Sequence, residues 1–134
     1  MEEEQRRALK GLAAIAAGLG LGAVLLAGPG ARALGMPAER RTLWGIRLFG
    51  VRELCLAFGL ARAAESGDPG QGRLMADLIT AAQAGDSVLA AALLARGELS
   101  WRVALVVWSG VPPTLVATRK ARGRKPGIAP PVNS

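Results

Sequence analysis

Residues 11–31 contain no charged side chain, and this neutral stretch restricts the possible folds of the 134-residue chain more than any other feature. An uncharged apolar segment of about 18 residues or more is long enough to cross a bilayer as one helix. The apolar core of a cleaved signal peptide is shorter, at about 7–15 residues. We therefore expect a transmembrane helix at about residues 11–27 rather than a cleaved signal.

Three further apolar segments of similar length follow this stretch. Their boundaries contain Gly and Pro, which end helices because Gly favours turns and Pro lacks the backbone N–H. The segments do not alternate between apolar and polar residues as strands do. Helices are predicted at about residues 11–27, 43–64, 74–95 and 99–118, with breaks at 28–30, 66–72 and 96–98.

The predicted fold is all-α: a polytopic membrane protein with a bundle of four transmembrane helices in residues 1–118. Residues 119–134 are basic and rich in Pro, so we expect a disordered cytoplasmic tail there. Pro112 and Pro113 remove two backbone donors from the fourth helix, which is therefore expected to kink.

Small residues recur at four-residue spacing in two of the predicted helices. Ala14, Gly18 and Gly22 share one face of the first helix, and Ala81 and Gly85 share one face of the third. Such faces allow close contact between transmembrane helices. We predict that both faces pack against neighbouring helices.

The formal net charge of +7 comes from 17 Lys and Arg against 10 Asp and Glu. In a soluble domain this excess would suggest nucleic-acid binding. Here the basic residues flank the apolar segments, and the basic run at 119–125 contains no aromatic residue for base stacking, so no nucleic-acid partner is expected. Ten Lys and Arg on the side of the two termini, against five opposite, predict a multi-pass protein of the bacterial inner membrane with both termini in the cytoplasm.

Side chains that bind metals or support redox chemistry are scarce. The chain has no His, and Cys55 is its only cysteine. Haem and zinc sites with His ligands, iron–sulfur clusters and intrachain disulfides are thereby excluded. We predict no metal and no cofactor. Because Cys55 lies inside an apolar segment, we expect its thiol to be packed and inert.

The second and third predicted helices contain charged residues near their centres. A charge at the middle of a bilayer costs at least ~2.5–3.5 kcal/mol, so these side chains are expected to face the bundle interior and to pair. The expected pairs are Arg52 with Asp86, and Glu53 with Arg47 or Gln83. Arg52 and Glu53 point about 100° apart on the helix and are not expected to share a partner. The two arginines and two carboxylates together form a neutral buried network.

These five residues and Trp108 are the predicted ligand-binding residues. Trp108 lies seven residues after Trp101, on the same helix face, and is expected to line the bundle. No catalytic residue is assigned, but Glu53 and Asp86 are the candidates because burial can make a carboxyl group a proton donor. A purely structural role, in which the cluster only docks two helices together, remains equally open.

The sequence GIRLFGVREL at residues 45–54, continued by Phe58-Gly59-Leu60, resembles the second-helix signature of small bacterial four-helix membrane proteins. The nearest resemblance is to an uncharacterised family with a domain of unknown function, and DoxX-like proteins are more distant look-alikes. By this motif, Arg47, Arg52 and Glu53 are the positions that carry over. The first resemblance implies a four-helix bundle of unknown activity. A DoxX-like relation would imply a membrane subunit of sulfur or quinone redox chemistry, for which the chain has no redox motif.

We interpret the chain as an integral inner-membrane protein that binds a small amphipathic ligand, or a partner membrane subunit, at the Arg/Glu/Asp cluster. Two alternatives remain open: a membrane-embedded acid–base enzyme acting on a lipid or isoprenoid, and a DoxX-like redox subunit or small proton-coupled carrier. The expected partners are the lipid bilayer, a hydrophobic or amphipathic small molecule, and a second copy of the chain or another membrane subunit.

Overall fold

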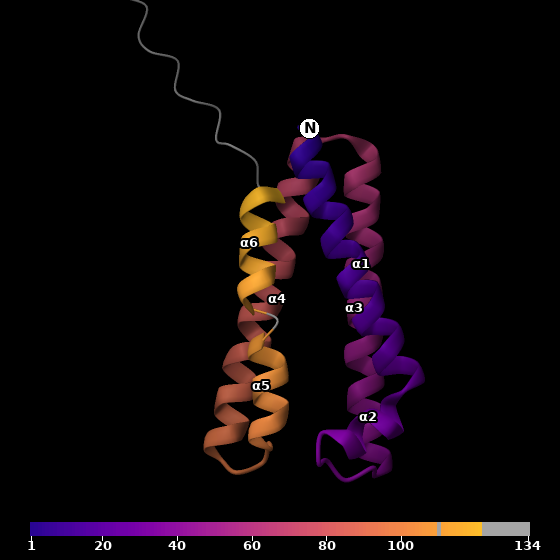
Figure 1. Cartoon of the computed structure of the whole chain (residues 1–134), viewed down its shortest axis with the longest axis vertical. Helices are drawn as coiled ribbons and strands as arrows, with labels where there is room; N and C mark the ends of the chain where they lie inside the picture. The colour runs from indigo at the N-terminus through magenta and orange to yellow at the C-terminus, as the bar shows by residue number, and fades with distance from the viewer. Residues whose placement is uncertain (110, 122–134) are drawn as a thin grey trace, which may run out of the picture.

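All the secondary structure in the described part of the chain is helical. The computed structural model describes residues 1–109 and 111–121, and no strand occurs among them, so the predicted all-α fold is confirmed. The predicted tail lies largely outside the described residues, but its first three residues belong to the last helix. The helices are α1 Glu3–Leu25, α2 Ala27–Ala33, α3 Arg40–Ser66, α4 Pro69–Ala95, α5 Trp101–Ser109 and α6 Val111–Ala121 (Figure 1).

The break between α3 and α4 is shorter than predicted. Gly67 ends α3 with a φ of 71°, a left-handed conformation that glycine adopts without strain. The side chain of Asp68 accepts a hydrogen bond of 2.8 Å from the backbone N–H of Gly70, and Pro69 is the first residue of α4. The predicted loop at 66–72 is therefore wrong in extent, because an Asp cap followed by Pro starts a helix.

The predicted end of the first helix at residues 28–30 is also wrong. The helical chain is interrupted at Leu26 and continues as α2, which contains Pro29 in its first turn. Proline is tolerated there because the first N–H groups of a helix have no partner within the helix.

The predicted fourth helix is helical on both sides of residue 110, which lies outside the described residues. α5 covers Trp101–Ser109 and α6 covers Val111–Ala121, and α6 contains Pro112 and Pro113. The kink expected beside the two prolines falls at this boundary of the described residues and stays a prediction.

The helices form two antiparallel groups. α1 packs along α3, while α4 packs against α5 and α6 (Figure 1). The groups meet near the N-terminus, where α1 contacts α6 and where Lys120 Nζ lies 3.4 Å from Glu4 Oε1. Toward the other end the two groups diverge, and α5 packs only on α4 and α6 among the described helices. A hydrogen bond of 3.2 Å from Ser100 Oγ to the Leu34 carbonyl connects them there.

α1 and α3 approach each other closely at two glycines that were not predicted to lie at a helix contact. A Cβ atom on Gly20 of α1 would lie 2.8 Å from the Gly50 carbonyl oxygen of α3, and a Cβ on Gly50 would lie 2.8 Å from the Gly20 carbonyl oxygen. By contrast, a Cβ on Gly18, Gly22 or Gly85 would meet nothing within 4 Å among the described residues. The predicted small-residue faces are therefore not helix contacts within this chain.

The buried core occupies the half of the bundle nearest the N-terminus. It is built from short side chains and a few leucines, which lets α1, α3 and α4 approach closely. The core ends where the helix groups begin to diverge. Its members are Leu9, Leu12, Ala13, Leu60, Ala63, Ala64, Ala76 and Ile79.

Two helices, α1 and α4, are long and apolar enough to cross a membrane. With 27 residues, α3 is about 40 Å long, which is sufficient length, but charged side chains interrupt its apolar sequence. α5 and α6 contain 9 and 11 residues on the two sides of residue 110, which lies outside the described residues.

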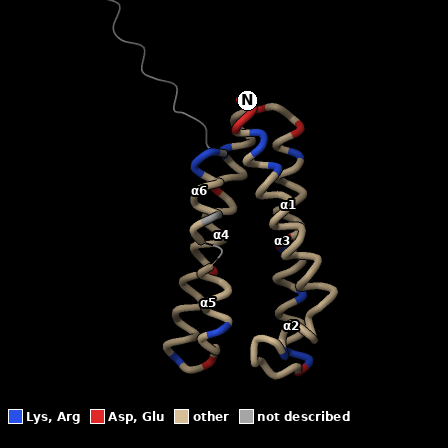
Figure 2. The backbone as a smooth tube through the Cα atoms, viewed as in Figure 1, with Lys and Arg blue, Asp and Glu red and all other residues tan. Residues whose placement is uncertain are grey.

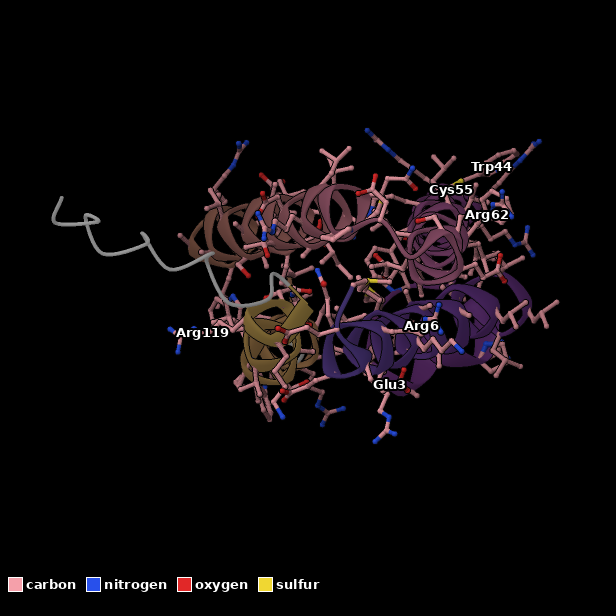
Figure 3. The ribbon with its side chains drawn as sticks, turned by 90° about the horizontal axis from the view of Figure 1, so that it is seen from above. Glu3, Arg6, Trp44, Cys55, Arg62 and Arg119 are labelled. Atoms are coloured by element: carbon pink, nitrogen blue, oxygen red, sulfur yellow. The ribbon has the colours of Figure 1, made fainter. Side chains whose placement is uncertain are left out.

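The prediction of a packed thiol at Cys55 is wrong, because this residue is exposed. Figure 3, which looks along the helices, shows Cys55 and Trp44 on the outer side of α3. Phe58 on the same helix is also exposed. The apolar sequence around Cys55 therefore does not show whether its side chain faces the bundle interior or the exterior.

Candidate ligand-binding site

Arg52 of α3 joins two carboxylates. Its Nη1 donates to Asp86 Oδ1 of α4 at 2.6 Å, and its Nη2 donates to Asp86 Oδ2 at 2.5 Å. The same Nη2 donates to Glu53 Oε1 at 2.7 Å. Two parallel N–H···O bonds between a guanidinium and a carboxylate form a strong, directional pair. The predicted pairing of Arg52 with Asp86 is present.

The predicted partner of Glu53 is wrong. Neither Arg47 nor Gln83 bonds to Glu53, which is instead bound by its neighbour Arg52. The 100° between adjacent positions does not prevent this contact, because arginine has a long side chain and five N–H donors. Arg52 therefore donates to both carboxylates at the same time.

Arg47 lies outside this cluster. It is exposed and forms no ion pair with any described residue. Five residues separate it from Arg52, which places it about 7.5 Å along the helix and about 140° around it. The cluster of Arg52, Glu53 and Asp86 therefore has a formal charge of −1 (one arginine, two carboxylates), and the expected neutrality is wrong.

The three side chains of the cluster differ in exposure. Glu53 is 9% exposed, Asp86 is 22% exposed and Arg52 is 38% exposed. The guanidinium carbon of Arg52 lies 4.9 Å from the ring centre of Phe49, a cation–π distance. The Nε of Arg52 is buried and has no hydrogen-bond partner in the described chain. Glu53 is thus the most deeply buried charge of the cluster.

A pocket lies beside the cluster, at the edge of the core. Its enclosed volume is about 30 Å³, and the surrounding space of about 350 Å³ includes the open exterior. Leu12 and Ile79 belong to both the core and the pocket wall. Its lining combines a few polar side chains with a larger apolar surface from α1, α3 and α4. The lining residues are Leu12, Ile15, Ala16, Leu19, Arg52, Glu53, Leu56, Ile79, Ala82, Gln83 and Thr114.

Gln83 connects the pocket to α5. Its Nε2 donates to the Val107 carbonyl at 3.2 Å. The Ser109 hydroxyl donates to the Val106 carbonyl of the same helix at 2.8 Å. Gln83 therefore bonds to the backbone of α5 and not to Glu53 as predicted.

Trp108 is 36% exposed and is not among the residues that line the pocket. The nearby Trp101 is also exposed, and the guanidinium carbon of Arg102 lies 5.8 Å from its ring centre. Sequence reasoning missed Thr114 and the apolar wall from α1. A single Thr in an apolar segment is a weak indication of a site, so Thr114 was hard to predict. In an uncharged helix, nothing in the sequence distinguishes the residues that line a pocket from the other apolar residues.

The fold and the site together define an all-helical protein with two apolar helices of membrane-spanning length and an ion-pair cluster beside a pocket. Among the described residues, no group of three or more His, Cys, Asp or Glu side chains is arranged to hold a metal ion. No protein-family model, no curated protein and no solved structure matches the chain. Its function must therefore be inferred from the site.

Proposed function

We propose that the chain is a multi-pass membrane protein in which α1, α3, α4 and the α5–α6 pair form four spans. Only 28% of the apolar window of α1 and 11% of that of α4 are buried, whereas the core helix of a soluble protein is mostly buried. Leu25, Phe58 and Val88 are each at least 70% exposed, on three different helices. Apolar surface of this extent is stable against lipid rather than water.

The distribution of charge supports the same proposal. Figure 2 shows Lys and Arg concentrated at the two ends of the helices, with few charges between them. The N-terminus and the end of α6 lie at the same end of the molecule, as an even number of spans requires (Figure 1). With more Lys and Arg at that end, the positive-inside rule favours a bacterial inner-membrane protein with both termini in the cytoplasm.

We further propose that the protein holds a small amphipathic ligand in the pocket beside Arg52, Glu53 and Asp86. The observation that carries this proposal is the lining itself, in which an ion-pair cluster adjoins a larger apolar wall. Small-molecule sites combine apolar surface with a few polar groups in this way. Charged residues inside membranes are costly, and they commonly mark functional sites.

Native mass spectrometry of the detergent-purified protein tests this function. We expect a retained small molecule on the wild type and its loss from Glu53→Gln and Asp86→Asn. Arg47→Ala is the matched control, because it removes an exposed arginine of the same helix that lies outside the cluster. Bare protein in all samples, with the two cluster variants only less stable, would instead favour a role for the cluster in helix docking alone.

A further inference from the structure

We propose that the ligand of this pocket is a lipophilic organic monocation, with the Glu53 carboxylate as its counter-ion. The proposal rests on the function proposed above and adds the charge of the ligand. It follows from the charge of the cluster, the acceptors in the pocket wall and the fact that Arg52 is the only Lys or Arg among the described lining residues.

The cluster has one carboxylate more than Arg52 neutralises. Both Nη atoms of Arg52 already donate to the carboxylates of Asp86 and Glu53. On the α1 side, the segment 11–31 that supplies one pocket wall contains no charge. A buried charge without a counter-charge is strongly unfavourable in a medium of low polarity. The pocket therefore favours a ligand of charge +1.

Apart from Arg52, the polar side chains of the pocket wall offer hydrogen-bond acceptors. Glu53 accepts from Arg52 through Oε1, and Oε2 receives no donor from the described residues. Gln83 uses its Nε2 on the Val107 carbonyl, which leaves its Oε1 as an acceptor. Thr114 adds a hydroxyl group. An ammonium group supplies the N–H donors that these oxygens can accept, and the apolar wall suits its hydrocarbon chain.

An anionic ligand fits the same wall poorly. Three of the five guanidinium N–H groups of Arg52 are used by Asp86 and Glu53, which leaves the buried Nε–H and one N–H of Nη1 as donors. Two carboxylates lie on the same arginine and would repel a negative group. The two remaining donors therefore do not reverse the preference set by the charge of the cluster.

The test compares three probes of equal chain length: octylammonium, octanol and octanoate. Their equilibrium binding to the full chain is measured in nanodiscs of zwitterionic lipid, with empty nanodiscs as the background. We expect saturable binding of octylammonium, at least tenfold tighter than that of octanol, and no saturable binding of octanoate. If octanol binds as tightly, or octanoate more tightly, the charge assignment is overturned while the amphiphile-binding function stands. If no probe binds, both proposals fail.

Two variants test the role of the excess carboxylate. Glu53→Gln and Asp86→Asn each bring the formal charge of the cluster to zero with little change in shape. We expect each to weaken octylammonium binding by about tenfold to a hundredfold, and octanol binding much less, since hydrogen bonds to charged groups are the stronger ones. Arg47→Gln, outside the cluster, should leave both affinities unchanged. Equal losses for both probes would mean that the carboxylates only maintain the structure, and would overturn the proposal.

Discussion

Replacing Gly20 by Ala tests the close contact between α1 and α3. The new Cβ would lie 2.8 Å from the Gly50 carbonyl oxygen, which is 0.6 Å inside the 3.4 Å at which ordinary contact begins. Backbone at such a crossing cannot yield as a flexible side chain does, and overpacking of this kind costs about 1–3 kcal/mol. The same substitution gains about 0.5–1 kcal/mol of helix propensity, which must be separated from the steric cost.

Gly18→Ala provides that separation. Gly18 lies two residues earlier on the same helix, and a Cβ there would meet no described atom within 4 Å. Both variants have the same gain in propensity, so the difference between them is the steric cost alone, about 1–3 kcal/mol. For a chain of this size that is a difference in Tm of roughly 4–12 °C.

Thermal unfolding in one detergent, followed by tryptophan fluorescence, measures this difference. We expect the Tm of Gly18→Ala to equal or exceed that of the wild type, and the Tm of Gly20→Ala to fall below it. Equal Tm values for the two variants would refute the assignment of the crossing to Gly20 and Gly50.

Two further predictions concern the cluster and the outer face of α3. Asp86→Ala should lower the free energy of unfolding by about 1–3 kcal/mol, because it leaves two donors of Arg52 without their acceptor. In a double-mutant cycle with Arg52→Ala, denaturant titration should give a coupling energy of about 0.5–3 kcal/mol, and additive losses would exclude a direct interaction. Cys55 is exposed, and in intact membranes we expect it to react with membrane-permeant N-ethylmaleimide but not with a charged methanethiosulfonate. Rapid labelling by the charged reagent would contradict the proposed lipid exposure of this face.

The all-α fold and the Arg52–Asp86 pair could be predicted because their physical signals are strong. Long neutral segments have few alternatives to a helix. Opposite charges near the centres of two apolar helices have few partners other than each other. The helix ends were harder to predict. The usual effect of proline predicts a break at Pro29 and at Pro69, but Pro69 starts a helix and Pro29 lies in the first turn of one.

The partner of Glu53 and the pocket could not be predicted by the same reasoning. Helical spacing describes where a side chain leaves the backbone, but not where a long side chain such as Arg52 ends. In an apolar helix, the positions that face a neighbour, a pocket or the exterior are chemically alike. The sequence therefore could not show that Cys55 is exposed whereas Leu12 is buried at the pocket. Only the packing of α1 on α3 distinguishes the two positions.

The hydrogen bond between Arg52 and its neighbour Glu53 bears on how α3 is inserted into the proposed membrane while the protein is being made. Ribosomes synthesise α3 before α4, so Arg52 and Glu53 must enter the proposed membrane before Asp86 exists. Because these two side chains are bound to each other at 2.7 Å, α3 can be inserted as a locally neutral segment without waiting for its partner helix. The excess negative charge arises only when α4 arrives, so the proposed binding site is complete only late in assembly.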